Sequence, residues 1–182
     1  MGQYFCLVNE SRREYAHSPS VMKLWEWAVN SEHRLFVGAL LSSSWNCDRV
    51  ALVGDYNQKR VTWDELEAWK EIFPKGKGLE EREKEILSFC KKKGFKPVYF
   101  CLDRNEYIAQ SEIGGDSTNV LGVLIYLLAY SFSEGEPEET GSILARWAFC
   151  KIEARDSIPE GARSISREGE EFLKEERAFV SK

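Results

Sequence analysis

Tyr4-Phe5-Cys6-Leu7 opens the chain, and the same four letters return as Tyr99-Phe100-Cys101-Leu102. Each copy is followed by a polar turn and then by a short stretch that begins with Glu-Tyr, at Glu14-Tyr15 and at Glu106-Tyr107. An apolar strand, a polar turn containing Asn and a second strand are the pattern of a β-hairpin. Counted from the tetrapeptides, the second loop is three residues shorter than the first. We therefore predict two related hairpins.

The features that follow the two hairpins match in order. Each half continues with an apolar run, a Trp and a strand that begins with a basic residue, at Leu35–Leu41, Trp45 and Arg49–Val53 and again at Leu121–Tyr130, Trp147 and Lys151–Ala154. We predict an internally duplicated α+β fold whose two units are related by a pseudo-twofold axis. On this alignment both apolar runs are strands, although a short apolar run also fits a helix. The alternative is that Tyr-Phe-Cys-Leu is only a common kind of buried strand.

The chain divides into four segments within one compact domain. The predicted boundaries are a first repeat at 1–60, a helical connector at 61–96, a second repeat at 97–158 and a C-terminal helical tail at 159–182. Capping signals, periodicity and charge order predict helices in and between these segments, at Val21–Asn30, Trp63–Phe73, Leu79–Lys93 and Ser166–Val180.

Composition excludes some classes of function. The chain has 182 residues, is 43% hydrophobic and 30% charged, and carries a net charge of -5. An acidic chain disfavours broad contact with nucleic acid, so we expect at most weak binding through Lys75, Lys77 and Lys91–Lys93. No segment has the roughly 18 apolar residues of a membrane span, and no secretory signal is evident. Five cysteines without a C-x-x-C pair indicate free thiols in a reducing, intracellular compartment.

The cysteines at the two tetrapeptides add one expectation about geometry. If the copies are equivalent, Cys6 and Cys101 occupy matching positions and could lie near each other across the pseudo-axis. No spacing of the cysteines is typical of a metal site, and we predict neither a metal nor a cofactor.

Catalysis has little support in the sequence. Only His17 and His33 are present, and neither has the spacing of a nucleophile, base and carboxylate set. The richest polar cluster surrounds Trp45, and its candidate ligand-binding residues are Trp45, Asp48, Arg49 and Asp55. Two carboxylates and an Arg can form a binding site, or can simply be turn residues at the ends of strands.

Tryptophan is abundant, with six residues in the chain. Most are expected in the core, but Trp is also enriched where proteins meet. The candidate interface residues are Trp25, Trp27, Trp63 and Trp69. A protein partner or a second copy of the chain is the predicted partner, and a homodimer is reasonable if tryptophans or sheet edges are exposed.

Several motifs lie in residues 1–56, with a weaker echo at 98–156: Met1–Phe5 with Val8-Asn9 and Glu14-Tyr15, Lys23–Trp27, Trp45-x-x-Asp48-Arg49-Val50 and Val53–Tyr56. These motifs resemble an uncharacterised protein family of bacteria, fungi and large DNA viruses of amoebae, and are most similar to members of the marseillevirus type. Relatives carry a glycine-rich stretch before the Trp motif, where this chain has Ser42-Ser43-Ser44. The resemblance implies no established reaction. It implies a virus-encoded protein located in the host cytoplasm or in particles.

Two functions follow as hypotheses. The first is a non-enzymatic structural or interaction protein, such as a virus-encoded component of the particle or virus factory. The second is a small-ligand or nucleotide-processing enzyme with its site near Asp48, Arg49 and Asp55.

Overall fold

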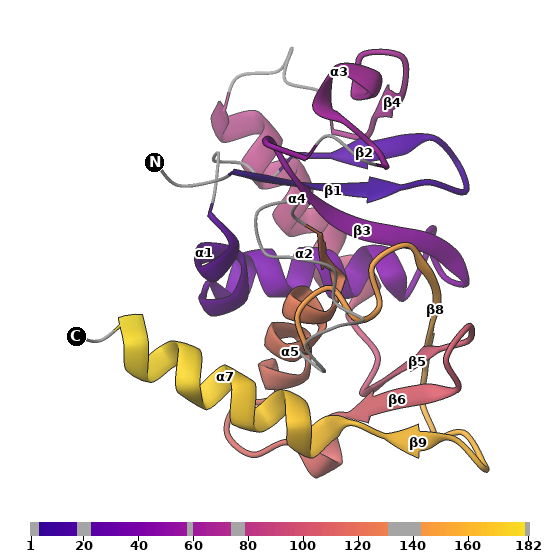
Figure 1. Ribbon diagram of the computed structural model, residues 1–182. Coiled ribbons are helices and arrows are strands. Elements are labelled where there is room, and N and C mark those ends of the chain that lie inside the picture. Colours follow the sequence, from indigo (N-terminus) through magenta and orange to yellow (C-terminus); the bar gives the residue numbers. More distant parts are fainter. Residues whose placement is uncertain (1–3, 18–22, 58–59, 74–78, 131–142, 181–182) are drawn as a thin grey trace.

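The structure is a computed structural model that describes residues 4–17, 23–57, 60–73, 79–130 and 143–180 (Figure 1). The Lys75–Gly78 linker, with Lys75 and Lys77, and the acidic loop at 133–141 lie outside these residues. The described elements, in chain order, are β1 (Phe5–Asn9), β2 (Glu14–Ala16), α1 (Leu24–Val29), α2 (Ser31–Leu41), β3 (Asp48–Gly54), α3 (Trp63–Leu66), β4 (Lys70–Glu71), α4 (Leu79–Lys93), β5 (Val98–Cys101), β6 (Glu106–Ala109), a 3-10 turn (Gln110–Glu112), α5 (Asn119–Leu128), β7 (Ala129–Tyr130), β8 (Cys150–Arg155), β9 (Arg163–Ser164) and α7 (Ser166–Val180).

The predicted α+β class is confirmed, because the strands form one nine-stranded mixed sheet covered by helices. The strand order is β4-β2-β1-β3-β8-β5-β6-β9, and β7 pairs with β3. We call β1 to β4 the first half of the sheet and β5, β6, β8 and β9 the second half. The halves meet where β3 and β8 pair antiparallel, and each ends in a two-residue edge strand that pairs parallel to its neighbour.

The ladders of the two halves have the same register. Asn9 pairs with Glu14 and Val50, as Cys101 pairs with Glu106 and Ile152. The loops that close the hairpins therefore have equal lengths, residues 10–13 and 102–105. The predicted three-residue difference between the loops is wrong, because the two tetrapeptides lie three positions apart in their strands. The match of the pairings is a fact of topology, whereas duplication as its origin stays a prediction.

This register also separates the cysteines that the tetrapeptides align. Cys6 belongs to a buried cluster with Val8 and Val53, whereas Cys101 belongs to the main core with Ile152. Side chains alternate between the two faces of a strand, and these clusters lie on opposite faces of the sheet. The expected proximity of Cys6 and Cys101 is therefore wrong.

Both apolar runs predicted as strands are helices. Leu35–Leu41 belongs to α2 and Leu121–Leu128 to α5, so the strand predictions are wrong there, and only the last two residues of the second run, Ala129–Tyr130, form a strand, β7. Every residue of α5 is buried, because the helix packs against α1, α2 and α7 as well as the sheet. A helix buried on all sides has no polar face, so its sequence lacks the 3.6-residue alternation that identifies a surface helix.

The remaining helix predictions have mixed outcomes. Helices at Leu79–Lys93 and Ser166–Val180 are confirmed as α4 and α7. The described part of the first predicted helix is shorter, Leu24–Val29. The prediction for Trp63–Phe73 is wrong beyond Leu66, because the chain turns there and β4 pairs with β2. The capping box of Thr62 and Glu65 is present and explains why α3 begins at Trp63.

The main core lies between the sheet and the helices α1, α2, α4, α5 and α7, which Figure 1 shows around the central α2 and α5. A smaller cluster, under α3, buries the opposite face of β1 and β3. Among the described residues, no helix is both long and apolar enough to cross a membrane.

Candidate functional site

The predicted ligand-binding residues begin with Trp45 and Asp48. Trp45 is fully buried and its indole N–H donates to Glu14 Oε2 at 3.0 Å, so it stabilises the core. Asp48 accepts hydrogen bonds from the Asn9 amide at 2.8 Å and from Arg12 Nε at 2.6 Å. These contacts place Asp48 at the end of the sheet where the hairpin loop closes.

Arg49 and Asp55 lie in different places. Arg49 forms an ion pair with Asp103 at 2.8 Å and donates to the carbonyl of Phe149 at 3.0 Å, so it bridges the two halves of the sheet. Asp55 accepts from the backbone N–H of Tyr4 at 3.1 Å. Because Asp48 and Asp55 are at opposite ends of β3, they are roughly 20 Å apart and do not form one site.

The four tryptophans predicted to form an interface lie in different environments. Trp27 is fully buried and Trp25, on the other side of α1, is 38% exposed. Trp63 and Trp69 are partly buried against the small cluster under α3, and the Trp63 indole donates to the Val53 carbonyl at 3.2 Å. Of these four, Trp25 is the one whose side chain is exposed rather than buried or partly buried.

Both histidines pack against aromatic rings. His17 lies edge-on between Tyr15 and Trp63, and His33 packs against Trp27. Burial lowers the pKa of His33 to about 4, so the ring is neutral at physiological pH. A buried neutral histidine on an aromatic ring fits a structural role better than general-base catalysis.

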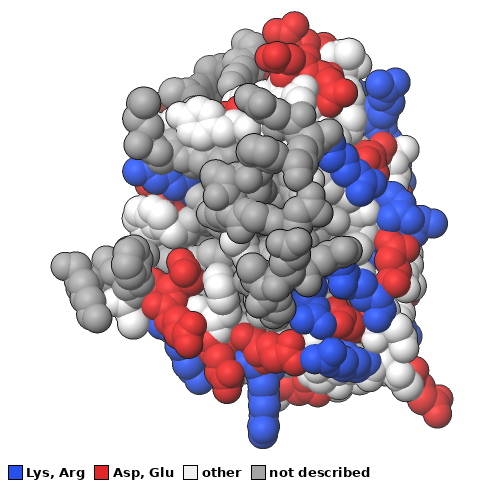
Figure 2. All heavy atoms as spheres, viewed as in Figure 1, with Lys and Arg blue, Asp and Glu red and all other residues white. Residues whose placement is uncertain are grey.

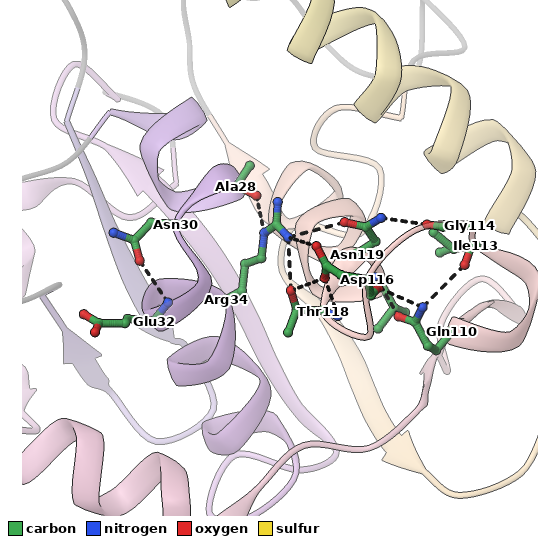
Figure 3. Close-up of polar contacts among 11 residues, drawn as sticks. Ala28, Asn30, Glu32, Arg34, Gln110, Ile113, Gly114, Asp116, Thr118 and Asn119 are labelled. Atoms are coloured by element: carbon green, nitrogen blue, oxygen red, sulfur yellow. Dashed lines mark hydrogen bonds and ion pairs between the residues drawn. The ribbon is translucent and has the colours of Figure 1, made fainter.

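A buried arginine connects the halves on the helical side (Figure 3). Arg34 is 3% exposed; its guanidinium donates to the Ala28 carbonyl and, through Nη1, to Thr118 Oγ1 at 3.1 Å and Asn119 Oδ1 at 3.4 Å. The Asp116 carboxylate lies 3.8 Å from the same nitrogen. Arg34 therefore ties α1 and α2 to the start of α5.

Two glycines allow this close approach. A Cβ on Gly122 would lie 3.3 Å from the Ala28 carbonyl oxygen and 3.4 Å from Arg34 Nε. Gly115 has φ +91, and a Cβ there would lie 2.1 Å from Asn119 Nδ2. The Gly114–Ser117 loop thus has a packing role in this network.

A polar cleft lies where the 3-10 turn after β6 meets β9 and the first turn of α7. It has a volume of about 530 Å³, and its described lining residues are Glu112, Ser164, Arg167 and Glu168. We call it the β9–α7 cleft. It joins strand residues to the first turn of α7, so its shape depends on the packing of that helix against the second half of the sheet.

Hydroxyl groups hold Glu112 in the cleft. It accepts hydrogen bonds from Tyr107 Oη at 2.8 Å and from Ser164 Oγ. Burial raises the pKa of Glu112, but hydrogen bonds from Ser164, Ser166 and Tyr107 offset this and leave the pKa below its usual value. Glu112 is therefore ionised at neutral pH.

Arg167 supplies the opposite charge in the cleft. Among the described residues neither Arg167 nor Glu112 forms a salt bridge, whereas Glu168 pairs with Arg163 at 2.7 Å. The cleft thus presents one guanidinium and one hydroxyl-bound carboxylate, and the charge of Arg167 contributes to lowering the pKa of Glu112.

A buried ion pair supports the wall of the cleft. Glu106 is 6% exposed, accepts two hydrogen bonds from Arg146, at 2.9 and 2.5 Å, and accepts a third from the Trp147 indole at 3.2 Å. Arg146 also lies 3.7 Å from Glu168, which lines the cleft. Burial raises the pKa of Glu106, but the bonds from Arg146 and Trp147 lower it more.

Two thiols lie at the loop end of the second half. Cys101 is the last residue of β5 and pairs with Ile152 of β8, so Cys150, two residues earlier in β8, is its diagonal neighbour on the same face. Cys101 is buried and Cys150 is partly buried against the same core. We call these residues the thiol pair.

Sequence reasoning missed Arg34, the β9–α7 cleft and the thiol pair. Glu14 and Glu106, and likewise Trp45 and Trp147, were recognised as matching residues of the two halves. The hydrogen bond that each Glu accepts from the Trp of its own half was not predicted. That pairing was available from the order of the repeat. The thiol pair required the ladder register, which the tetrapeptides misaligned.

Comparisons with known proteins give no relatives: no family model, no curated protein and no solved structure matches the chain. Among the described residues, no group of three His, Cys, Asp or Glu side chains is placed to hold a metal ion. The function therefore has to be argued from the site alone.

Proposed function

We propose that this chain is a non-enzymatic binding protein and that a protein partner contacts the β9–α7 cleft. The observation that carries the proposal is the pair of opposite charges, Arg167 and Glu112, that line one hollow without a salt bridge among the described residues. A partner with an acidic and a basic side chain at matching spacing would pair with both groups. Such charge complementarity fixes orientation and rejects partners with the reverse order.

The size of the cleft suits a partner segment. A volume of about 530 Å³ lies within the range of pockets that enclose ligands or anchoring side chains. Arginine is favoured at interfaces because its planar fork binds a carboxylate with two hydrogen bonds. The support from Tyr107, Ser164 and Ser166 holds Glu112 in place, which lowers the entropy lost on binding.

Catalysis in the same cleft has less support. The Ser164 hydroxyl donates to Glu112, which superficially suggests a nucleophile and a base. However, a general base works best with a pKa near the working pH, and the pKa of Glu112 is lowered rather than raised. The enzyme alternative at Asp48, Arg49 and Asp55 is not favoured either, because Asp55 is at the far end of β3.

The distribution of charge also favours a discrete contact. On the face shown in Figure 2, basic and acidic side chains are interspersed over the described surface, without a continuous basic area. Weak nucleic-acid binding through the exposed Lys91–Lys93 stays a prediction, as do self-association, a role in particles or virus factories, and the location in the host cytoplasm.

Quantitative affinity capture tests the proposal. Tagged wild-type chain, Arg167→Glu and the control Lys84→Glu, which makes the same charge change on the exposed face of α4, would be incubated with lysate of the organism that encodes the chain. We expect a partner that is depleted at least tenfold by Arg167→Glu and retained by Lys84→Glu. Circular dichroism checks that both variants fold.

Two outcomes would reject this function. Equal capture of every enriched protein by wild type and Arg167→Glu removes the cleft as the binding site. The absence of any protein enriched over a tag-only control rejects the binding function itself.

A further inference from the structure

The thiol pair has a structural counterpart in the first half of the sheet. Asn9 pairs with Val50 and is diagonal to Asp48, as Cys101 pairs with Ile152 and is diagonal to Cys150. In the first half this diagonal is closed by a 2.8 Å hydrogen bond from the Asn9 amide to Asp48. The backbone therefore brings side chains at these two positions into direct contact.

An arginine completes both arrangements. Arg12 in the first hairpin loop donates to Asp48 at 2.6 Å, and Arg104 occupies the corresponding place in the loop at 102–105 and interacts with Cys150. Cys150 thus lies where the first half holds the side chain of Asp48, beside a hydrogen-bond donor and a guanidinium. A site built in this way stabilises an anion, and for Cys150 that anion is the thiolate.

We propose that Cys101 and Cys150 are a peroxide-reactive thiol pair, in which Cys150 is the attacking thiolate and Cys101 the resolving thiol. The geometry supplies three parts of such a site: a partly buried thiol, an arginine at the matching place in the hairpin loop and a second thiol as its diagonal neighbour in the ladder. Redox-sensitive cysteines in proteins have these neighbours.

The local charges agree with this assignment. A hydrogen bond from Cys101 lowers the pKa of Cys150; burial and Asp103 raise it, and Arg104 lowers it, for a net value of about 7. The same hydrogen bond, with burial, raises the pKa of Cys101, which keeps that sulfur protonated. Of the two thiols, Cys150 therefore loses its proton more readily than Cys101.

The chemistry balances with a hydroperoxide as oxidant. The Cys150 thiolate attacks the distal peroxide oxygen, the O–O bond breaks, and alkoxide or hydroxide leaves and takes a proton, which gives the Cys150 sulfenic acid. The Cys101 sulfur then attacks the Cys150 sulfur, the S–O bond breaks and water leaves with the Cys101 proton. Cys101 is the last residue of β5 and Cys150 the first residue of β8. The small movement that closes the disulfide therefore leaves the hydrogen bonds in the middle of these strands intact.

The other cysteines provide an internal comparison. Cys47 is exposed, but burial of its sulfur and the charges of Glu153 and Asp48 raise its pKa. Cys6 and Cys90 are buried. If exposure alone controlled reactivity, Cys47 would react first; if thiolate stabilisation controls it, Cys150 reacts first.

Timed alkylation of the native protein with iodoacetamide at pH 7, read by peptide mass spectrometry, separates these possibilities. We expect Cys150 to react roughly tenfold faster than Cys47, with a rate that rises through an inflection near pH 7. Arg104→Gln moves the inflection upward by about one unit and lowers the rate at pH 7 by roughly fivefold. The matched control, Arg12→Gln, removes the corresponding arginine of the first half and leaves the rate unchanged.

Hydrogen peroxide tests the second step. Treated wild-type chain becomes lighter by two hydrogen atoms and loses two free thiols, whereas Cys101→Ser stops at a sulfenic acid that dimedone traps on Cys150. The proposal is overturned if Cys47 is alkylated before Cys150, or if peroxide oxidises Cys150 without linking it to Cys101. Circular dichroism and the unchanged alkylation of Cys47 identify variants that fold.

Discussion

In the first half of the sheet, the Trp45 indole donates to Glu14, whose other oxygen accepts from Lys70 at 3.2 Å at the solvent boundary. In the second half, the Trp147 indole donates to Glu106, which is held by two hydrogen bonds from Arg146. Lys70 is 74% exposed and Arg146 is 17% exposed. The same position in the ladder therefore carries a loose surface pair in one half and a buried, rigid pair in the other.

The diagonal positions at the loop ends differ in a second way. The first half places Asn9 and Asp48 there, joined by a hydrogen bond, and the second half places Cys101 and Cys150, whose two thiols have shifted pKa values. The backbone pairing is alike, so the difference is in the side chains. The comparison indicates that the first half is built for stability, whereas the second half carries the chemistry and the cleft.

The largest expected effect comes from breaking the Trp-bound carboxylates. Glu106→Gln removes the charge that pairs with Arg146 in a mostly buried site and leaves Arg146 only the 3.7 Å contact with Glu168, which costs about 3 kcal/mol. Glu14→Gln keeps an acceptor for Trp45 and releases the exposed Lys70 to water, so it costs under about 1 kcal/mol. Urea unfolding of both variants measures the two free energies. Equal losses would mean that the two pairs are energetically alike and would remove this difference between the halves.

The helices differ in their response to acid. His33 lies in the first turn of α2, and α5 has no ionisable residue in its own first turn. Because burial lowers the pKa of His33 from 6.5 to about 4, the unfolded chain binds this proton more readily. Stability is then fully present above pH 6.5 and falls by about 3 kcal/mol as the pH drops to 4.

The pH slope of the unfolding free energy tests this sign. His33→Gln removes the slope between pH 6.5 and 4, whatever its effect on absolute stability. The carboxylates act lower: the pKa values of Glu106 and Glu112 are lowered, so their stabilisation is present above the unfolded-state pKa and is lost as the pH falls through the folded-state pKa. A variant slope equal to that of the wild type would show that His33 is not the group that titrates.

The sequence predicted the parts of the fold that have a polar side or a recognisable cap. The hairpins, the strands after Trp45 and Trp147, and the surface helices α4 and α7 were found in this way. It failed for α2 and α5, because helices buried on nearly all sides read as short apolar runs. It also aligned the two halves three residues out of register. The alignment followed the identical tetrapeptides and not the hydrogen-bonded Glu and Trp of each half.

The candidate site was predicted less well than the fold. Asp48 and Arg49 were recognised as a polar cluster, but their partners Arg12 and Asp103 come from hairpin loops far away in the chain. Contacts of this kind depend on the register of the ladder. The predicted alignment of the two halves was wrong by three residues, so it could not identify these partners. Such cross-strand partners are the information that a single sequence lacks.

The smallest expected effect is at the seam between the halves, where Asp103 both pairs with Arg49 and accepts from the backbone N–H of Lys151 at 3.0 Å. In the first half the corresponding acceptor is Ser11, which accepts from the backbone N–H of Arg49 at 2.9 Å. Asp103→Ser therefore keeps the backbone hydrogen bond and removes only the ion pair, which is one-third exposed and stabilises by under about 1 kcal/mol.

A double-mutant cycle of Asp103→Ser with Arg49→Gln measures that coupling by urea unfolding, and salt should reduce it further. The same variant sharpens the comparison of the halves, because the charge of Asp103 raises the pKa of Cys150. Asp103→Ser should then lower that pKa and speed alkylation of Cys150 while slightly lowering stability. This sign is opposite to that of Arg104→Gln. A slower reaction in Asp103→Ser would show that the ordering of the loop at 102–105, rather than the charge of Asp103, controls the reactivity of Cys150. Charge would then no longer distinguish a reactive half of the sheet from a structural half.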